Sequence, residues 1–136
     1  QFNPEYFDGE HAQYLIWAQT VSNRLEIVIS KKGFEIDGNL IPKKELAVLL
    51  KNRLTQDLDY AIVLNFKENI NFGTYFGVIS KVNEAIYALR DEEAFKGYGM
   101  DYKTLEEEYR YGGEGTRENI KTIQAKYPMK YVENWD

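Results

Sequence analysis

Carboxylates are the most frequent side chains in this sequence that could perform chemistry. They occur in close groups at Asp57 and Asp59, at 91–93 and at 106–108. Two converging carboxylates, one of them poorly solvated, can act as the acid and base of a hydrolase. On the polar face of a helix the same residues are usually only solvated charges. We therefore expect no enzyme, and keep a carboxylate-dependent hydrolase acting through residues 91–118 as an alternative.

A metal or phosphate site finds little support in the sequence. His11 is the only histidine and there is no cysteine, so the usual zinc ligand sets cannot be assembled. The segment GGEGTRENI, residues 112–120, resembles a phosphate-binding loop ahead of a helix, but it lacks the lysine and hydroxyl pair of the Walker motif. We interpret the segment as a linker and His11 as a surface residue, and we expect no cofactor and no metal.

Aromatic residues are abundant, with eleven Tyr, seven Phe and two Trp. Tyr75, Phe76 and Tyr87 follow the apolar stripe of a predicted long helix, so we expect them in the core. Four tyrosines fall instead in an acidic, glycine-broken region, and their exposure stays open: Tyr98, Tyr102, Tyr109 and Tyr111. Exposed tyrosines suit sugar or protein contacts. A small periplasmic sugar- or peptide-binding domain is therefore a second alternative.

The charge of the chain narrows the class of partner. Its 136 residues carry a net charge of −5, so the basic field that drives nucleic-acid binding is missing and we expect no nucleic-acid partner. Residues 31–53 differ, because they hold six Lys or Arg against three Asp or Glu. This basic end could meet an anionic partner, although an ordinary solvated helix face has the same composition.

The first two thirds of the chain predict an α/β (α+β) fold. RLEIVIS, residues 24–30, alternates like a strand, and FEI, residues 34–36, is a short returning strand between two glycine turns. A helix is expected from Pro42 to about Leu54, and a longer one carries a stripe over 75–89. Residues 59–66 are apolar on both faces, which places them in a sheet interior. The order predicts a two-layer sandwich, a small mixed sheet with two main helices on one face.

The apolar periodicity is weaker in the last third of the chain, after Arg90. Short helices are predicted over 101–109 and 116–127, with Thr116 as the N-cap of the second. The tail over 129–135 alternates weakly and predicts an edge strand.

Two parts of the chain are distinguished by composition. Residues 1–22 are mixed and predict an N-terminal tether or docking segment, whereas residues 23–136 are long enough for one core with a C-terminal helical extension. The apolar stretches fall far short of the roughly 20 residues that span a membrane.

Three segments resemble one protein family in order and spacing. They are LEIVISKKGFEIDGNLIPKKELAVLL (25–50), YAIVLNF (60–66) and INFGTYFGVISKVNEAI (70–86), and together they resemble the periplasmic domain of the ExbD/TolR biopolymer transport family. Residues 83–108 and IQAKYPMKYVE (123–133) are similar to the longer form found in Bacteroidetes-type bacteria. Many members have an acid just after the central strand, where this chain has Lys67 followed by Glu68. Any role for that acid is therefore in doubt here.

The resemblance implies a binding role without catalysis. It implies the periplasmic domain of an ExbD-like subunit in a proton-motive-force-driven complex that supports TonB-dependent outer-membrane transport. A single-pass anchor upstream of Gln1 would hold the domain on the bacterial inner membrane, and the family's proton-carrying aspartate would lie in that anchor. The implied partners are an ExbB/TolQ-like subunit, a TonB- or TolA-like protein and a second copy of the chain, with peptidoglycan as a further ligand.

A small sheet with a free edge can bind a partner's extended segment by strand addition. The sequence offers two edge candidates, the short strand 34–36 and the tail near 130–132. The expected docking residues are Phe34, Glu35, Ile36, Lys130, Tyr131 and Val132.

Overall fold

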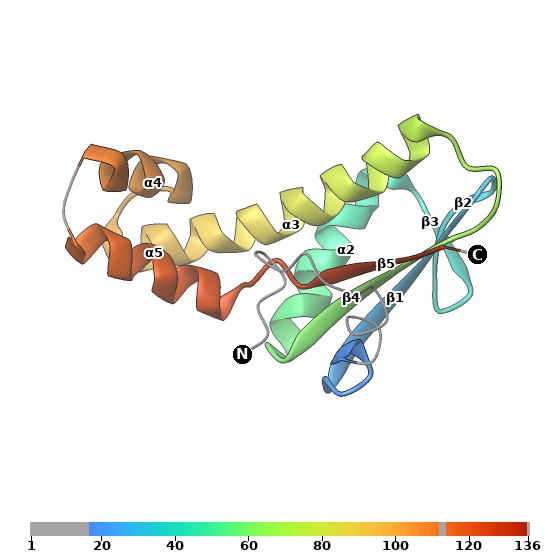
Figure 1. The fold of residues 1–136 in the computed structure, drawn as a ribbon, viewed down its shortest axis with the longest axis horizontal. Coiled ribbons are helices and arrows are strands. Elements are labelled where there is room, and N and C mark those ends of the chain that lie inside the picture. The colour runs from blue at the N-terminus through green and yellow to red at the C-terminus, as the bar shows by residue number, and fades with distance from the viewer. Residues whose placement is uncertain (1–16, 112–113, 136) are drawn as a thin grey trace.

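The computed structural model describes residues 17–111 and 114–135 (Figure 1). The predictions for His11 and for the first sixteen residues of the tether lie outside this part of the chain. The strands are β1 (Asn23–Ser30), β2 (Gly33–Ile36), β3 (Asn39–Ile41), β4 (Tyr60–Phe66) and β5 (Tyr131–Trp135). The helices are α2 (Lys43–Gln56), α3 (Phe72–Tyr98), α4 (Tyr102–Tyr111) and α5 (Glu114–Lys126). The predicted α/β class is confirmed.

The strands form one open sheet in the order β3-β2-β1-β4-β5. Tight turns make β1, β2 and β3 an antiparallel meander, whereas β4 and β5 run parallel to β1 because helices connect them. The predicted interior position of β4 is confirmed, since β1 and β5 pair with its two edges. The Asp-Gly turn between β2 and β3 also forms as expected, with positive φ at both Asp37 (53°) and Gly38 (80°).

Helices α2 and α3 cover one face of the sheet, and α4 and α5 extend from the far end of α3 (Figure 1). The main core lies between the two layers. Its sheet side is the alternate residues Leu25, Ile27 and Ile29 of β1 with the matching positions of β4. Its helix side is the i, i+4 stripe of α2, exemplified by Leu46 and Leu50, and the corresponding stripe of α3.

The other sheet face is covered in part by the end of the predicted tether. Ala18 is buried against Ala61, Val63 and Val132, with Trp17 beside them. The described end of the 1–22 segment is thus packed onto the domain.

Two helix boundaries differ from the sequence predictions. The stripe predicted for α3 stops at Leu89, but the helix continues to Tyr98 and ends where Gly99 adopts the left-handed conformation (φ 74°). The prediction of Thr116 as an N-cap is wrong, because α5 already begins at Glu114. For α3, packing of Ala94 within the helical extension outweighs the local signal.

The predicted core positions of Phe76 and Tyr87 are wrong, since their side chains are 60% and 42% exposed. Only one stripe of α3 faces the sheet, and these two rings project beside it. Tyr75 packs partly buried against the core as expected. Among the four tyrosines whose exposure the sequence left open, Tyr102 is buried and Tyr98 is partly buried. Tyr109 and Tyr111 are exposed.

Within residues 17–111 and 114–135, no helix combines the length and apolar character needed to cross a bilayer.

Candidate functional site

Among the strands that the structure describes, the free edges of the sheet are β3 and β5, not β2. The prediction of Phe34–Ile36 as an edge strand is therefore wrong. The Asp37-Gly38 turn adds β3 outside β2, so both backbone edges of β2 are already paired. The side chains of Phe34 and Ile36 are buried in the main core, and Glu35 is partly buried on the other face. This half of the expected docking surface is closed to strand addition.

The C-terminal strand β5 is an edge strand, as predicted. The Ile62 N–H donates to the Lys130 carbonyl across 2.9 Å, which fixes the phase of the parallel ladder. Because bonding positions alternate along a strand, the backbone N–H and C=O groups of Val132 point toward β4, as the carbonyl of Lys130 does. The backbone N–H and C=O groups of Tyr131 and Glu133 therefore point outward, away from the sheet.

The three expected docking residues on and beside β5 contribute backbone rather than side chains. The side chain of Val132 is buried on the sheet face opposite α2 and α3, beside Ala18. Tyr131 packs against the main core. The Lys130 ammonium lies 5.3 Å from the centroid of the Trp17 ring. The outward surface along β5 is therefore mainly main chain.

An aromatic pocket lies at the end of this edge. It encloses about 320 Å³ between the start of α3 and the last residue of β5, and its lining consists of Ile70, Asn71, Phe72, Tyr75 and Trp135. The Trp135 ring stacks on Phe66 with centroids 4.4 Å apart, and Phe66 is fully buried. The free edge of β5 thus ends beside the aromatic pocket, and the Trp135 ring that lines this pocket packs on the buried core residue Phe66.

Tyr75 and Glu133 join α3 to β5 within this region. The Tyr75 hydroxyl donates to the Glu133 carboxylate across 2.7 Å. Desolvation of the phenol and this bond to a carboxylate raise the pKa of Tyr75 to about 12. Glu133 also accepts from the Trp135 indole N–H at 3.3 Å. The two hydrogen bonds hold the end of β5 against α3.

Titration of Tyr75 is the first expected result. In a spectrophotometric pH titration, the difference between the wild type and Tyr75→Phe should show one phenol ionising near pH 12, above the usual value of 10. Because the folded-state pKa is raised, the stability from this group is complete below pH 10 and is lost as the pH rises through 12. The control is Tyr111→Phe, whose exposed ring has no Glu133 partner. Ionisation of the Tyr75 phenol near pH 10 would contradict its desolvation and its hydrogen bond to Glu133.

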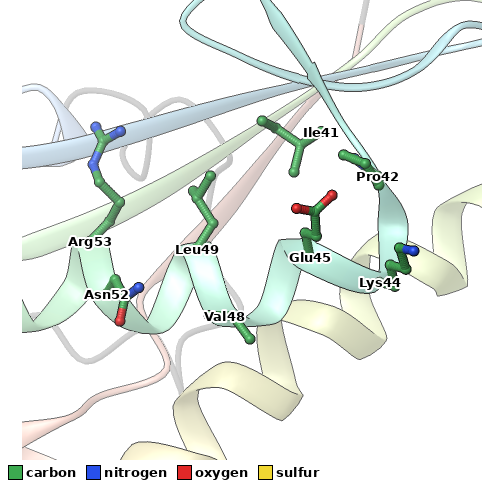
Figure 2. Close-up of a pocket in the computed structure, with 8 residues that line it drawn as sticks. All are labelled: Ile41, Pro42, Lys44, Glu45, Val48, Leu49, Asn52 and Arg53. Atoms are coloured by element: carbon green, nitrogen blue, oxygen red, sulfur yellow. The ribbon is translucent and has the colours of Figure 1, made fainter.

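A second groove follows the opposite edge of the sheet, between β3 and α2 (Figure 2). It encloses about 430 Å³. Figure 2 shows Leu49 and Glu45 rising from α2 toward Ile41 at the end of β3. Arg53, at the far end of the groove, forms an ion pair with Asp37. The β3 edge is only three residues long and Pro42 follows it directly, so it offers less backbone than β5.

The grouped carboxylates have structural partners, both at Asp57 and in the 91–118 region of the hydrolase alternative. Asp57 accepts the Ser22 hydroxyl at 2.5 Å, and that bond lowers the pKa of Asp57, whereas a general acid requires a raised pKa. Asp91 accepts the backbone N–H of Tyr102 at 2.9 Å, and Glu93 forms an ion pair with Lys126. Each of these carboxylates has a structural partner of its own.

The helical extension has a groove of about 400 Å³ between α4 and α5. Glu106 is its one acidic lining residue, beside Arg110, Arg117 and Lys121. Within the part of the chain that the structure describes, no group of three or more metal-ligating side chains comes together.

Sequence reasoning missed the aromatic pocket. Its one available signal was INFGTYFG. Tyr75 and Phe76 of this segment were expected in the core and no position was predicted for Phe72, which is 77% exposed. In comparisons with known proteins, no family model, no curated protein and no solved structure matches this chain.

Proposed function

We propose that this chain is the periplasmic domain of an ExbD-like subunit of an energy-transduction complex supporting TonB-dependent outer-membrane transport. In this proposal it acts by binding an extended segment of a TonB- or TolA-like partner along β5, and it is not an enzyme. A single-pass anchor upstream of Gln1 holds it on the inner membrane beside an ExbB/TolQ-like subunit. A second copy and peptidoglycan are further proposed partners.

The observation that carries the proposal is the free edge of β5. Tyr131 and Glu133 turn outward backbone groups that no described strand pairs, on a strand that is otherwise fixed by β4. A partner strand would gain main-chain hydrogen bonds there, and its last side chains would reach the aromatic pocket beside Trp135. Main-chain bonds supply affinity in this mode of binding, and pockets supply specificity.

The order of the elements is consistent with the resemblance. A strand, two hairpin strands, a helix, an interior strand and a long helix follow one another over Asn23–Tyr98. The residues that carry the resemblance fall on these elements in the expected order. This agreement supports the fold. The identity of the partner is inferred from the family resemblance.

The test is an NMR titration with a peptide from the periplasmic segment of the TonB-like partner. Saturating peptide is expected to shift the backbone amides of Tyr131 and Glu133, while amides of β2 stay in place. Two peptides with N-methyl groups at alternate residues provide a matched pair. Because alternate residues of an added strand face β5, one set should abolish binding and the other should bind nearly normally.

Three outcomes separate the candidate functions. Equal loss with both N-methylated peptides would contradict strand addition. Shifts confined to Phe72 and Trp135 with a sugar ligand would favour the sugar-binding alternative. No shift at saturating peptide would remove the proposed docking site.

A further inference from the structure

One end of the molecule collects segments that are far apart in the sequence. Because β1, β4 and β5 run parallel, all three finish there, with Ile29 beside Phe66 and Phe66 beside Trp135. The β1–β2 turn, the loop after β4 and the start of α3 lie at the same end (Figure 1). Lys67 N–H donates to the carbonyl of Ile29, which ties the start of the loop to the end of β1. We call this region the basic end.

The basic end carries five lysines, all exposed: Lys31, Lys32, Lys43, Lys44 and Lys67. The Lys43 ammonium lies over Gly77 of α3, so α2 and α3 share one charged surface. The acids nearby are Glu35, Glu45, Glu68 and Glu133, and Glu133 already accepts from Tyr75 and Trp135. A positive region in a chain of net charge −5 favours an anionic partner.

Exposed rings lie next to these charges. Phe72 is 77% exposed, Phe76 60% and Trp135 53%. Phe72 and Phe76 stack on each other with centroids 5.8 Å apart, on the first turn and a half of α3. Large apolar side chains grouped at the surface mark a contact with another apolar phase or partner.

We propose that the basic end docks on the surface of an anionic lipid bilayer. Lysines are attracted to anionic headgroups and keep their ammonium groups in water, while Phe and Trp rings enter the interfacial layer. A soluble polyanion would satisfy the charges but leave the three rings in water. All five cations are lysines, whose point charges suit a diffuse anionic surface better than the forked contacts that arginine makes.

This inference does not rest on the proposed function. The bilayer contact uses the lysines and rings at the strand ends, whereas the partner segment would use the backbone along β5. The two contacts share the rings of Phe72 and Trp135, which line the pocket at the end of β5. Helices α4 and α5 lie at the opposite end of the molecule (Figure 1) and would face away from the lipid. Docking would therefore orient the domain with its long axis away from the membrane.

The experiment is co-sedimentation of the full chain with phosphatidylcholine vesicles, with and without phosphatidylglycerol. The chain is expected to bind the vesicles that contain phosphatidylglycerol, and binding should weaken with added salt. The variant K31Q/K32Q/K44Q should bind more weakly by about fivefold for each lysine removed. The variant F72S/F76S should weaken binding to the same vesicles while leaving the salt dependence unchanged.

A matched control has the same charge change at the far end. K96Q/K103Q/K121Q removes three exposed lysines from α3, α4 and α5 and should bind like the wild type. Equal weakening in this control would overturn the assignment to the basic end. The proposal also fails if binding does not require phosphatidylglycerol, or if polyglutamate binds as tightly as the vesicles. Failure of peptide binding along β5 would leave this result unaffected.

Discussion

Leu64→Ala is expected to lower the free energy of unfolding by about 3 kcal/mol. Leu64 lies in the middle of β4, is fully buried and belongs to the main core between the sheet and α2 and α3. Removing its three outer carbons loses their transfer free energy and leaves a cavity. Because β1 and β5 hold β4 on both edges, the backbone cannot collapse into that space. Urea denaturation followed by circular dichroism measures the change.

The matched control is Val48→Ala in α2. Val48 is 62% exposed, so this change should alter stability by less than about 0.5 kcal/mol. A loss for Leu64→Ala as small as that of the control would contradict the assignment of β4 to the sheet interior. The slope of the denaturation curve should stay the same in both variants, since neither changes the surface exposed on unfolding.

Arg90→Leu is expected to release the helical extension. The Arg90 side chain is 2% exposed, and its Nε–H donates to the Tyr127 carbonyl at 2.9 Å. Its guanidinium lies 5.4 Å from the ring centroid of Tyr87 and 5.3 Å from that of Tyr102. A charged hydrogen bond and the two ring contacts, of which that with Tyr102 is buried, together contribute about 3 kcal/mol. Arg90 therefore ties α3 to the start of α4 and to the end of α5.

Native-state hydrogen exchange separates a local from a global effect. A loss of about 3 kcal/mol corresponds to exchange faster by about a hundredfold for the amides of α4 and α5. The amides of β4 should change far less. Arg110→Leu, which removes an exposed guanidinium from α4, is the matched control and should leave both sets unchanged. Equal acceleration in α4, α5 and β4 would show that Arg90 stabilises the whole domain rather than the joint.

The elements of the first two thirds of the chain were predictable because their signals are local. The alternation of Leu25, Ile27 and Ile29 and the Asp37-Gly38 turn each depend on neighbouring residues. The structure has a strand and an Asp-Gly turn at those places. The boundary of α3 was less predictable, because its last two turns are held by contacts with α4 and α5.

The candidate site was predicted only in part. The tail was expected to be an edge strand, and β5 is one. The assignment of Phe34–Ile36 to an edge failed because the sequence does not say that β3 pairs outside it. The exposure of Phe76 was missed for a related reason, since the apolar residues of α3 extend around the helix beyond the one stripe that faces the sheet.

The sequence by itself determined the local elements, the class of fold and the excess of lysine in residues 31–53. It carries these properties because periodicity, turn chemistry and charge are read from residues close together in the chain. Only the tertiary structure decided which strand edges are free and that Lys31, Lys67, Phe72 and Trp135 lie at one end. Strand order and register are set by pairing between distant segments, such as Phe66 with Trp135, and that pairing depends on packing of the whole sheet.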